Sequence, residues 1–291
     1  MKILNFGSLN LDYVYSVDHM VTGGETLCSE DLNLFCGGKG LNQSIALARA
    51  GAQVFHAGLI GEEGGPLRDA LQAAGVDCGY VRTVAGRSGH TIIQVDKSGQ
   101  NCILLYGGAN RAVTESFIDQ VLADFGPGDL LLLQNEINLL DQIIDRAYGR
   151  GMEIALNPSP FDGNLDSCDL GKIGLFLLNE VEGFQMTGET EAPLILNRLA
   201  ELYPAAEVVL TLGGDGCVYR KGDRRWSQPA FSVEAVDTTA AGDTFTGFFL
   251  AARAEGLSPE ECLRLASKAA AIAVTRPGAS PSIPLRAEVA V

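Results

Sequence analysis

The sequence of 291 residues predicts an α/β protein with a doubly wound, mainly parallel sheet and a small second β-sheet that forms a lid. Short apolar runs alternate with helical patterns along almost the whole chain. Many of these runs are apolar at consecutive positions, which is typical of strands covered by helices on both faces of a sheet. Two ribbon-like stretches interrupt the alternation and supply the predicted lid.

The strands of the main sheet are expected in the short apolar runs. These are residues 2–9, 53–60, 129–134, 152–157, 173–179 and 207–212, and a further strand-like run covers 231–236. The helical patterns lie at residues 41–50, 66–74, 114–124, 139–149, 192–203, 243–255 and 259–275. Ligands of such sheets bind at the carboxyl ends of the strands, so polar residues that follow strands are candidate site residues.

Residues 12–36 and 88–106 resemble β ribbons, and the second ribbon is expected to be a hairpin that turns near residues 97–100. The two ribbons can pair into a small sheet, which serves either as a lid over an active site or as a dimer contact. No linker, repeat or low-complexity tract divides the chain. Residues 1–291 are therefore expected to form one domain with this lid.

Composition excludes several classes of function. The formal net charge of −15 argues against a nucleic-acid-binding surface, which needs clustered Lys and Arg side chains. No run of roughly 18 apolar residues predicts a membrane span, and the apolar run at the N-terminus is too short for a signal peptide. The 7 cysteines are dispersed without a Cys-x-x-Cys pair, which predicts reduced thiols and a cytoplasmic location.

The turn before the helix at 243–255 is the strongest candidate for a site of chemistry. Residues 237–251 are Asp-Thr-Thr-Ala-Ala-Gly-Asp-Thr-Phe-Thr-Gly-Phe-Phe-Leu-Ala. Main-chain N–H groups at such a turn point into one space and the helix dipole adds partial positive charge, so an anion can bind without a basic side chain. Asp243 cannot itself bind an anion, which makes it a candidate catalytic base beside a phosphate. A helix-capping role for Asp243 is the alternative.

Two polar segments in the first half are candidate substrate contacts. Residues 37–44, Gly-Gly-Lys-Gly-Leu-Asn-Gln-Ser, match neither a Walker A loop nor Gly-x-Gly-x-x-Gly. They allow close approach of the main chain to a ligand and place Asn42 near its hydroxyl groups, or they form a tight turn with a solvated Lys39. Asn10 and Asp12 occupy alternate positions after the first strand, which suits either a polyol or an ordinary Asx turn.

Two strand ends in the second half are candidate nucleotide contacts. Asn179 and Glu182 are one helical turn apart and suit a hydrated metal ion near phosphates, although charges at a helix start are often only solvated. Residues 211–216, Thr-Leu-Gly-Gly-Asp-Gly, either lie along a nucleotide or form a hairpin into residues 217–220. The 3 histidines show no metal-ligand spacing, and no serine lies in Gly-x-Ser-x-Gly, so neither a transition-metal site nor a hydrolase triad is expected.

With these segments in order, the chain resembles the ribokinase family of carbohydrate kinases, also called the PfkB family. Both family signatures are present, at residues 37–43 and 237–245, and their order and spacing match along nearly the whole chain. The likeness is strongest to the ribose-phosphorylating members of the family. It lies in residues 8–12, 24–26, 108–110 and 271–279.

The resemblance implies ATP-dependent phosphorylation of a primary hydroxyl of a sugar, with D-ribose to D-ribose 5-phosphate as the leading reaction. Asp243 would take the hydroxyl proton, and the main chain at Ala240, Ala241 and Gly242 would stabilise the transferring phosphoryl group. The sugar would be held by Asn10, Asp12, Gly38, Lys39, Asn42 and Glu136. ATP and its Mg²⁺ would be bound by Asn179, Glu182, Thr211, Gly213, Gly216 and Ser267. A monovalent cation, usually K⁺, would be bound mostly through carbonyl groups of Asp237, Thr239, Ala273, Arg276, Gly278 and Ser282.

The chain departs from the family pattern at two positions. Gly23 stands where ribose-phosphorylating relatives have Pro, and Ser267 stands where relatives often have His or Asn. Relatives that act on fructose, 2-keto-3-deoxygluconate or nucleosides share the framework, so a kinase for one of these substrates is an alternative, as is a non-catalytic sugar or nucleotide sensor. We also expect a homodimer formed through the lid, because its ribbons have exposed edges.

Overall fold

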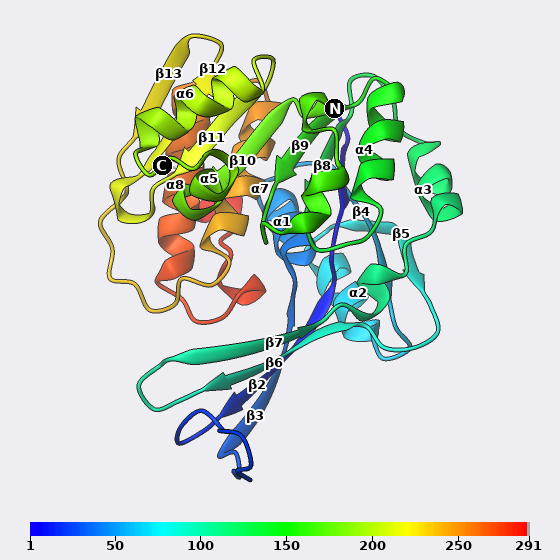
Figure 1. The fold of residues 1–291 in the computed structure, drawn as a ribbon, viewed down its shortest axis with the longest axis vertical. Coiled ribbons are helices and arrows are strands. Elements are labelled where there is room, and N and C mark those ends of the chain that lie inside the picture. Colours follow the sequence, from blue (N-terminus) through cyan, green and yellow to red (C-terminus); the bar gives the residue numbers. More distant parts are fainter. Residues whose placement is uncertain (290–291) are drawn as a thin grey trace.

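The computed structural model describes residues 1–289, which form two sheets with helices on both faces of the larger one (Figure 1). Within these residues, the nine strands of the larger sheet lie in the order β13-β12-β11-β10-β9-β8-β1-β4-β5. Their bounds are β1 (Ile3–Phe6), β4 (Val54–Ile60), β5 (Asp77–Thr83), β8 (Leu130–Gln134), β9 (Glu153–Asn157), β10 (Leu175–Asn179), β11 (Glu207–Thr211), β12 (Cys217–Lys221) and β13 (Arg224–Gln228).

The pairing of these strands confirms the predicted sheet. In this spatial order, the seven strands β11, β10, β9, β8, β1, β4 and β5 pair in parallel. Strands β12 and β13 continue the sheet beside β11 as an antiparallel hairpin. Strand β8, with the sequence Leu-Leu-Leu-Leu-Gln, is buried at every position. Such a strand is stable only where helices cover both faces of the sheet, because neither set of alternating side chains can face water.

The helices divide into two groups that cover opposite faces. Helices α1, α2, α7 and α8 contribute to one buried apolar cluster, and α3, α4 and α6 contribute to the other. Neighbouring residues of β1 enter different clusters, Ile3 the first and Leu4 the second. The α-helices are α1 (Lys39–Arg49), α2 (Gly65–Ala73), α3 (Glu115–Leu122), α4 (Leu140–Gly149), α5 (Glu180–Thr187), α6 (Ala192–Leu202), α7 (Ala241–Ala254), α8 (Pro259–Val274) and α9 (Arg286–Val289). Short 3₁₀ turns cover Gly108–Arg111, Gly163–Ser167, Leu170–Lys172, Gly213–Asp215 and Ser280–Ser282.

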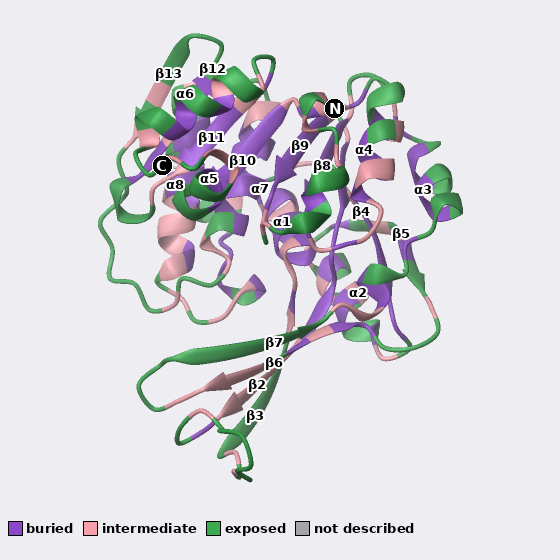
Figure 2. Cartoon of the chain, in the orientation of Figure 1, coloured by how far each residue is buried: buried purple, intermediate pink, exposed green. Residues whose placement is uncertain are grey.

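The second sheet is the predicted lid. Its strands are β2 (Asn10–Ser16), β3 (Asp31–Gly37), β6 (Gly89–Val95) and β7 (Asn101–Tyr106), in the order β3-β2-β6-β7. It projects from the end of the main body toward which β1 runs, and most of its residues are partly or fully exposed (Figures 1 and 2). The hairpin between β6 and β7 turns at residues 96–100, where the N–H of Asp96 donates to the carbonyl of Gln100.

The expected strand at residues 231–236 is wrong. This segment forms no strand and is exposed throughout, although its alternation of apolar and polar residues is strand-like. Its main chain meets helix α8 instead of another strand, because the N–H of Val236 donates to the carbonyl of Val274. A strand needs a partner edge, and a local pattern cannot show whether one is within reach.

Four elements lie outside the predicted list, namely strands β5 and β13 and helices α5 and α9, and β5 and α5 show why. Strand β5 forms the edge of the main sheet beside β4 and has only one fully buried residue, Val81. Helix α5 is short, and its apolar residues Val181 and Phe184 are exposed. Both elements lack the clear apolar periodicity on which sequence-based assignment depends. In the described part of the chain, no helix combines the length and the apolar character needed to cross a membrane.

Candidate active site

A cavity of about 220 Å³ lies where helix α7 begins, beside the carboxyl ends of β9, β10 and β11. This is the position expected for a ligand of a parallel sheet. Eight of the predicted site residues line it. They are Lys39, Asn179, Glu182, Thr211, Ala240, Ala241, Gly242 and Asp243.

Asp243 does not cap helix α7. The residue before the helix is Ala240, with a left-handed φ of 60°, and no side chain caps the helix start. The Asp243 side chain is buried and accepts two hydrogen bonds from helix α1: Asn42 Nδ2 donates to Oδ2 over 3.0 Å, and Gln43 Nε2 donates to Oδ1 over 2.9 Å. Both carboxylate oxygens are therefore held by amides, as a fixed base requires.

The first turn of α7 leaves main-chain donors beside this carboxylate. The N–H groups of Gly242 and Asp243 have no acceptor among the described residues, whereas that of Ala241 donates to the carbonyl of Thr238 over 3.2 Å. A Cβ placed on Gly242 would meet no atom within 4 Å, so this residue faces open space. Unpaired N–H groups at a helix start, with the positive end of its dipole, form a place for an anion. The expected donor at Ala241 is already engaged in this structure.

Lys39 is not the solvated lysine of a plain turn. Its main-chain N–H donates to Glu136 Oε2 over 3.0 Å, and the Ser8 hydroxyl donates to the same oxygen. Burial acts to lower the pKa of Lys39, but the negative charges of Asp243, Glu136 and Glu182 outweigh it and raise that pKa. Burial also raises the pKa of Glu136, against the opposing charge of Lys39. The ammonium thus faces three carboxylates across the site.

Asn10 and Asp12 lie in strand β2 rather than in an Asx turn. Asn10 Oδ1 accepts a hydrogen bond from Asn110 Nδ2 over 2.7 Å, and Asp12 Oδ1 accepts one from the Thr91 hydroxyl over 2.5 Å. Burial raises the pKa of Asp12 to about 6, the Thr91 hydrogen bond opposes this, and the charge of Glu136 adds to it. The lid therefore carries Asp12 to within electrostatic range of Glu136.

Gly37 and the predicted site residue Gly38 explain how closely the start of α1 approaches residues 8–12. A Cβ on Gly37 would come within 1.9 Å of Asp12 Oδ2. Gly38 has a φ of +92°, and a Cβ there would come within 3.1 Å of Ser8 Oγ and 3.2 Å of the Asn10 nitrogen. The start of α1 can pack against residues 8–12 only because these positions lack side chains.

Asn179 and Glu182 form a reciprocal capping box at the start of α5. Asn179 Oδ1 accepts from the Glu182 N–H over 2.9 Å, and Glu182 Oε2 accepts from the Asn179 N–H over 3.0 Å. Glu182 is only 7% exposed, so its charge is not simply solvated. The box orders a helix start beside the cavity, and both of its residues line that cavity.

Two alternatives were predicted for residues 211–216, a nucleotide contact or a hairpin into residues 217–220, and the structure shows the hairpin. The N–H of Leu212 donates to the carbonyl of Gly216, and β12 then pairs with β11. A Cβ on Gly216 would lie 2.1 Å from the Gln228 carbonyl oxygen, so this glycine is required by the hairpin. Thr211 lines the cavity, whereas Gly213, Gly216 and Ser267 do not. Ser267 is buried against Cys217.

The two loops predicted to bind a monovalent cation are joined by Asp237. Its carboxylate accepts from the Thr239 N–H over 2.9 Å and from the Gly278 N–H over 2.8 Å. The carbonyl of Ala273 accepts from the Arg276 N–H, and the Arg276 guanidinium pairs with Glu288. The Ser282 hydroxyl donates to the carbonyl of Ala279. Among the residues described, no group of three His, Cys, Asp or Glu side chains could hold a metal ion.

Three site residues were missed at the level of sequence. Gln43 holds Asp243, Gln134 holds Gln43, and Asn157 lines the cavity. Gln134 and Asn157 are the last residues of strands β8 and β9. Their position as the single polar residue at the end of an apolar run was the available signal.

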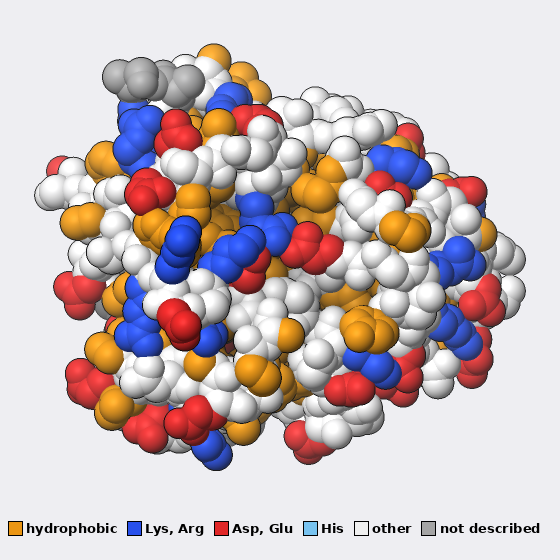
Figure 3. Space-filling model, turned by 90° about the horizontal axis from the view of Figure 1, so that it is seen from above, with side chains coloured by type: hydrophobic (Ala, Val, Ile, Leu, Met, Phe, Trp, Pro, Cys, Tyr) orange, Lys and Arg blue, Asp and Glu red, His pale blue; other side chains and the backbone are white. Residues whose placement is uncertain are grey.

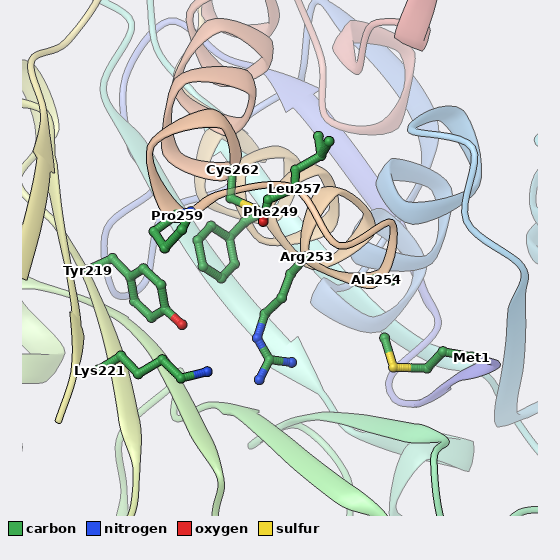
Figure 4. A pocket seen from close by; sticks show the side chains of 9 residues that line it. All are labelled: Met1, Tyr219, Lys221, Phe249, Arg253, Ala254, Leu257, Pro259 and Cys262. Carbon is green, nitrogen blue, oxygen red and sulfur yellow. Dashed lines mark hydrogen bonds between the residues drawn. The ribbon is translucent and has the colours of Figure 1, made fainter. Parts of the chain in front are cut away.

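A larger cavity, of about 340 Å³, lies at the opposite end of helix α7 and is shown in Figure 4. The side chains of Tyr219, Lys221, Phe249 and Arg253 surround it (Figure 4). Its cations are already neutralised, since Arg253 pairs with Glu153 and Glu207, and Lys221 pairs with Glu207 over 2.6 Å. On the face opposite the lid, Lys and Arg side chains lie among Asp and Glu side chains (Figure 3). The smaller cavity therefore holds the groups suited to chemistry.

A buried carboxylate beside unpaired helix-start N–H groups, on a mainly parallel α/β sheet, is the arrangement that a phosphotransferase for small molecules needs. Comparison with known families agrees, because residues 1–286 match the pfkB family carbohydrate kinase description. The chain belongs to the pfkB family of carbohydrate kinases.

Individual relatives are similar over their whole length. A ribokinase of Haemophilus influenzae is 38% identical over 292 residues, which cover 97% of this chain and 95% of the relative. A ribokinase of Bacillus subtilis is 34% identical, with coverage of 99% and 98%. The solved structure of Arabidopsis thaliana ribokinase complexed with ribose and ATP matches with a TM-score of 0.89 at 31% identity, covering 99% of this chain and 96% of that one.

Proposed function

We propose that this protein transfers the γ-phosphoryl group of ATP to the primary hydroxyl of D-ribose. The hydroxyl oxygen attacks the γ-phosphorus, the bond from that phosphorus to the bridging oxygen breaks, and ADP leaves. Asp243 accepts the hydroxyl proton, so the products are D-ribose 5-phosphate, ADP and one proton. The observation that carries the proposal is the buried, doubly held Asp243 carboxylate beside the unpaired N–H groups of Gly242 and Asp243.

The positions of the polar groups support a division of roles. The N–H groups of Gly242 and Asp243 stabilise the charge that develops on the migrating phosphoryl group. Lys39 balances the carboxylates that surround it and faces the same space. Glu182 and Asn179 present an ordered helix start to the phosphate chain, which suits a hydrated ion better than a protein-bound one. Mg²⁺ bound with the nucleotide would neutralise part of the phosphate charge.

A neutral sugar fits the acceptor side better than a sugar acid. The side chains expected there are the carboxylates of Asp12 and Glu136, the amides of Asn10 and Asn42, and one ammonium, Lys39, whose charge the carboxylates already balance. Carboxylates repel an acidic substrate, whereas they accept hydrogen bonds from hydroxyl groups. Asn42 Oδ1 is buried with no partner among the described residues, so it has a free acceptor for a hydroxyl. The ribokinase relatives support ribose among neutral sugars.

Substitution of Asp243 by Asn tests the catalytic role. We expect kcat to fall by about 10²–10⁴-fold, while the dissociation constants for sugar and ATP, measured by calorimetry, change little. A variant that loses only affinity, with kcat preserved, would assign Asp243 to binding. The acceptor is tested by ADP release with ribose, fructose, 2-keto-3-deoxygluconate and nucleosides. A kcat/KM that is higher for any of the others than for ribose would contradict the proposed substrate.

We also propose that a monovalent cation binds between the loops at 237–239 and 273–282. The Asp237 carboxylate already ties these loops together through the N–H of Gly278, and the Asp237 N–H donates to the carbonyl of Val274. A bound cation would keep the loop before α7 in the shape that exposes the N–H groups of the first turn. We expect a higher kcat in K⁺ than in Na⁺ at equal ionic strength, and equal rates would remove the site.

The lid supports a proposed homodimer. Both of its faces carry exposed apolar side chains, which a second copy of the lid would cover. The exposed residues are Leu32, Leu34, Phe35, Ile92, Ile103, Leu104, Leu105 and Tyr106. We expect a dimer by sedimentation, a monomer after Leu104→Lys, and an intact dimer after the control Leu285→Lys on the main body. A monomeric parent protein would end this proposal.

We also propose that the protein functions in the cytoplasm, because its seven cysteines are free thiols and a reducing compartment keeps thiols in this state.

A further inference from the structure

We propose that Gln43 is the positioning residue for Asp243. It holds Oδ1 of the carboxylate, so that Oδ2 is the oxygen that accepts the proton of the sugar. This inference rests on the proposed function, because it assigns a role within that reaction. Gln43 lies in helix α1, is fully buried, and donates from Nε2 to Asp243 Oδ1 over 2.9 Å. The two residues are 200 positions apart in the sequence.

The orientation of the Gln43 amide follows from a relay that starts at the main chain. The carbonyl of Gly40 accepts from Asn5 Nδ2 over 2.8 Å, so Asn5 Oδ1 faces the other way. That oxygen accepts from Gln134 Nε2 over 3.0 Å, and the same nitrogen donates to Gln43 Oε1 over 2.7 Å. Because the oxygen of Gln43 is occupied, its nitrogen faces Asp243.

A second relay imposes the same direction. The carbonyl of Leu177 accepts from Asn157 Nδ2 over 2.8 Å. Asn157 Oδ1 therefore points away from Leu177, and it accepts from Gln43 Nε2 over 3.4 Å. A main-chain carbonyl is only an acceptor and cannot reverse its role. The orientation of the Gln43 amide is thus fixed by two strands independently, by Gln134 at the end of β8 and by Asn157 at the end of β9.

The two oxygens of Asp243 consequently have different surroundings. Gln43, Gln134 and Asn5 are fully buried, so the amides that hold Oδ1 are shielded from solvent. Oδ2 is held by Asn42, whose own oxygen has no partner among the described residues and is free for a substrate hydroxyl. We therefore expect Oδ1 to stay bound to Gln43 throughout the reaction, while Oδ2 exchanges its contact with the substrate.

Two variants of Gln43 test the assignment. Gln43→Met keeps the volume but removes the donor, and we expect kcat to fall about 10–100-fold, with KM for sugar and ATP changed less than about threefold. Gln43→Glu places a second carboxylate against Asp243, in a site that also contains Lys39 and Glu136. When it is protonated, the introduced carboxyl group can donate as the amide does, so the ratio of variant to parent kcat should rise as pH falls from 8 to 5.5.

Controls separate positioning from general packing. Ser44 is buried beside Gln43 in helix α1, and its hydroxyl is hydrogen-bonded to His56 and to Asn5. Without this hydroxyl, Asn5 Nδ2 still donates to the carbonyl of Gly40, so the relay to Gln43 is kept. Ser44→Ala should therefore lower the melting temperature and leave kcat unchanged. In an Asp243→Ala background, Gln43→Met should have no further effect on kcat, because the effect acts through the carboxylate. If Gln43→Met does not fold, Gln134→Met releases the same amide and should lower kcat in the same direction.

The outcomes distinguish this inference from the proposed function. An active parent enzyme with an unchanged kcat in Gln43→Met overturns the inference alone. An equal loss of kcat in Ser44→Ala also overturns it, because the effect would then come from packing. A parent protein that phosphorylates no sugar of the panel overturns the proposed function and the inference together. A loss of kcat confined to the Gln43 and Gln134 variants, with recovery of Gln43→Glu at low pH, supports the inference.

Discussion

Replacement of Asp12 by Asn is expected to stabilise the protein at alkaline pH while it weakens sugar binding. Burial raises the pKa of the Asp12 carboxyl from 3.8 to about 6, against the hydrogen bond from Thr91 and with help from the charge of Glu136. An amide of the same shape can keep the bond to the Thr91 hydroxyl but carries no charge. The variant therefore removes only the ionisation of this position.

The sign and size follow from the two pKa values. Because the folded value lies above the unfolded value, protonation of Asp12 favours the folded state. This contribution to the free energy of unfolding is fully present below pH 3.8 and is lost as pH rises through about 6. The gap corresponds to about 3 kcal/mol at 1.36 kcal/mol per pKa unit, and about half of it falls between pH 5 and 8.

Urea unfolding at pH 5 and pH 8 measures this effect. The difference in unfolding free energy, Asp12→Asn minus parent, should be more positive at pH 8 by about 1–2 kcal/mol. The exposed Asp31→Asn, in the same lid, serves as the control and should show the same small difference at both pH values. KM for the sugar should rise about tenfold or more, because a bond to a charged acceptor is lost. A stability difference that does not change with pH would contradict the buried ionised carboxyl.

Three further substitutions have defined outcomes. Gly242→Ala adds a Cβ that meets no protein atom within 4 Å and lies at the cavity. We therefore expect unchanged or slightly raised stability and a kcat at least about tenfold lower. A fully active variant would contradict the proposed anion site at this turn. Glu182→Gln keeps the capping box through its one oxygen, but it removes the charge and the acceptor of Asn179 Nδ2. KM for Mg-ATP should therefore rise while the melting temperature falls only slightly; an unchanged KM would exclude Glu182 from nucleotide binding. Gly216 has a φ of +100°, and in Gly216→Ala the added Cβ would clash with the Gln228 carbonyl oxygen. The free energy of unfolding in urea should therefore fall by about 2 kcal/mol or more, without a change in KM for ATP. A raised KM would instead indicate a nucleotide contact at Gly216.

Much of the fold was predictable because it depends on local patterns. Consecutive apolar residues, as in β8, identify strands that are buried on both faces, and alternation with amphipathic helices defines the sheet. Elements without such a pattern were missed or wrong. Strand β5 lies at a sheet edge, α5 exposes its apolar residues, and residues 231–236 alternate like a strand but have no partner. Local periodicity reports burial only where the surroundings enforce it.

The site was predictable as a set of residues but not as a geometry. Asp243 and Asn179 follow strands or start helices, where the fold class places ligands. The turn alone left the role of Asp243 open between a cap and a base, because the same residue type serves both at a helix start, and only the family resemblance implied the base. Its hydrogen bonds to Asn42 and Gln43 decide between them.

The amino-acid sequence alone was enough for the α/β class, the lid ribbons and the glycine-rich turn at helix α7, since each arises from interactions between near neighbours in the chain. Chain folding was needed to bring Gln43, Gln134 and Asn157 around one carboxylate. These amides come from a helix and two strands that are distant in sequence, and a hydrogen bond depends on distances of a few tenths of an ångström. No local pattern contains that information.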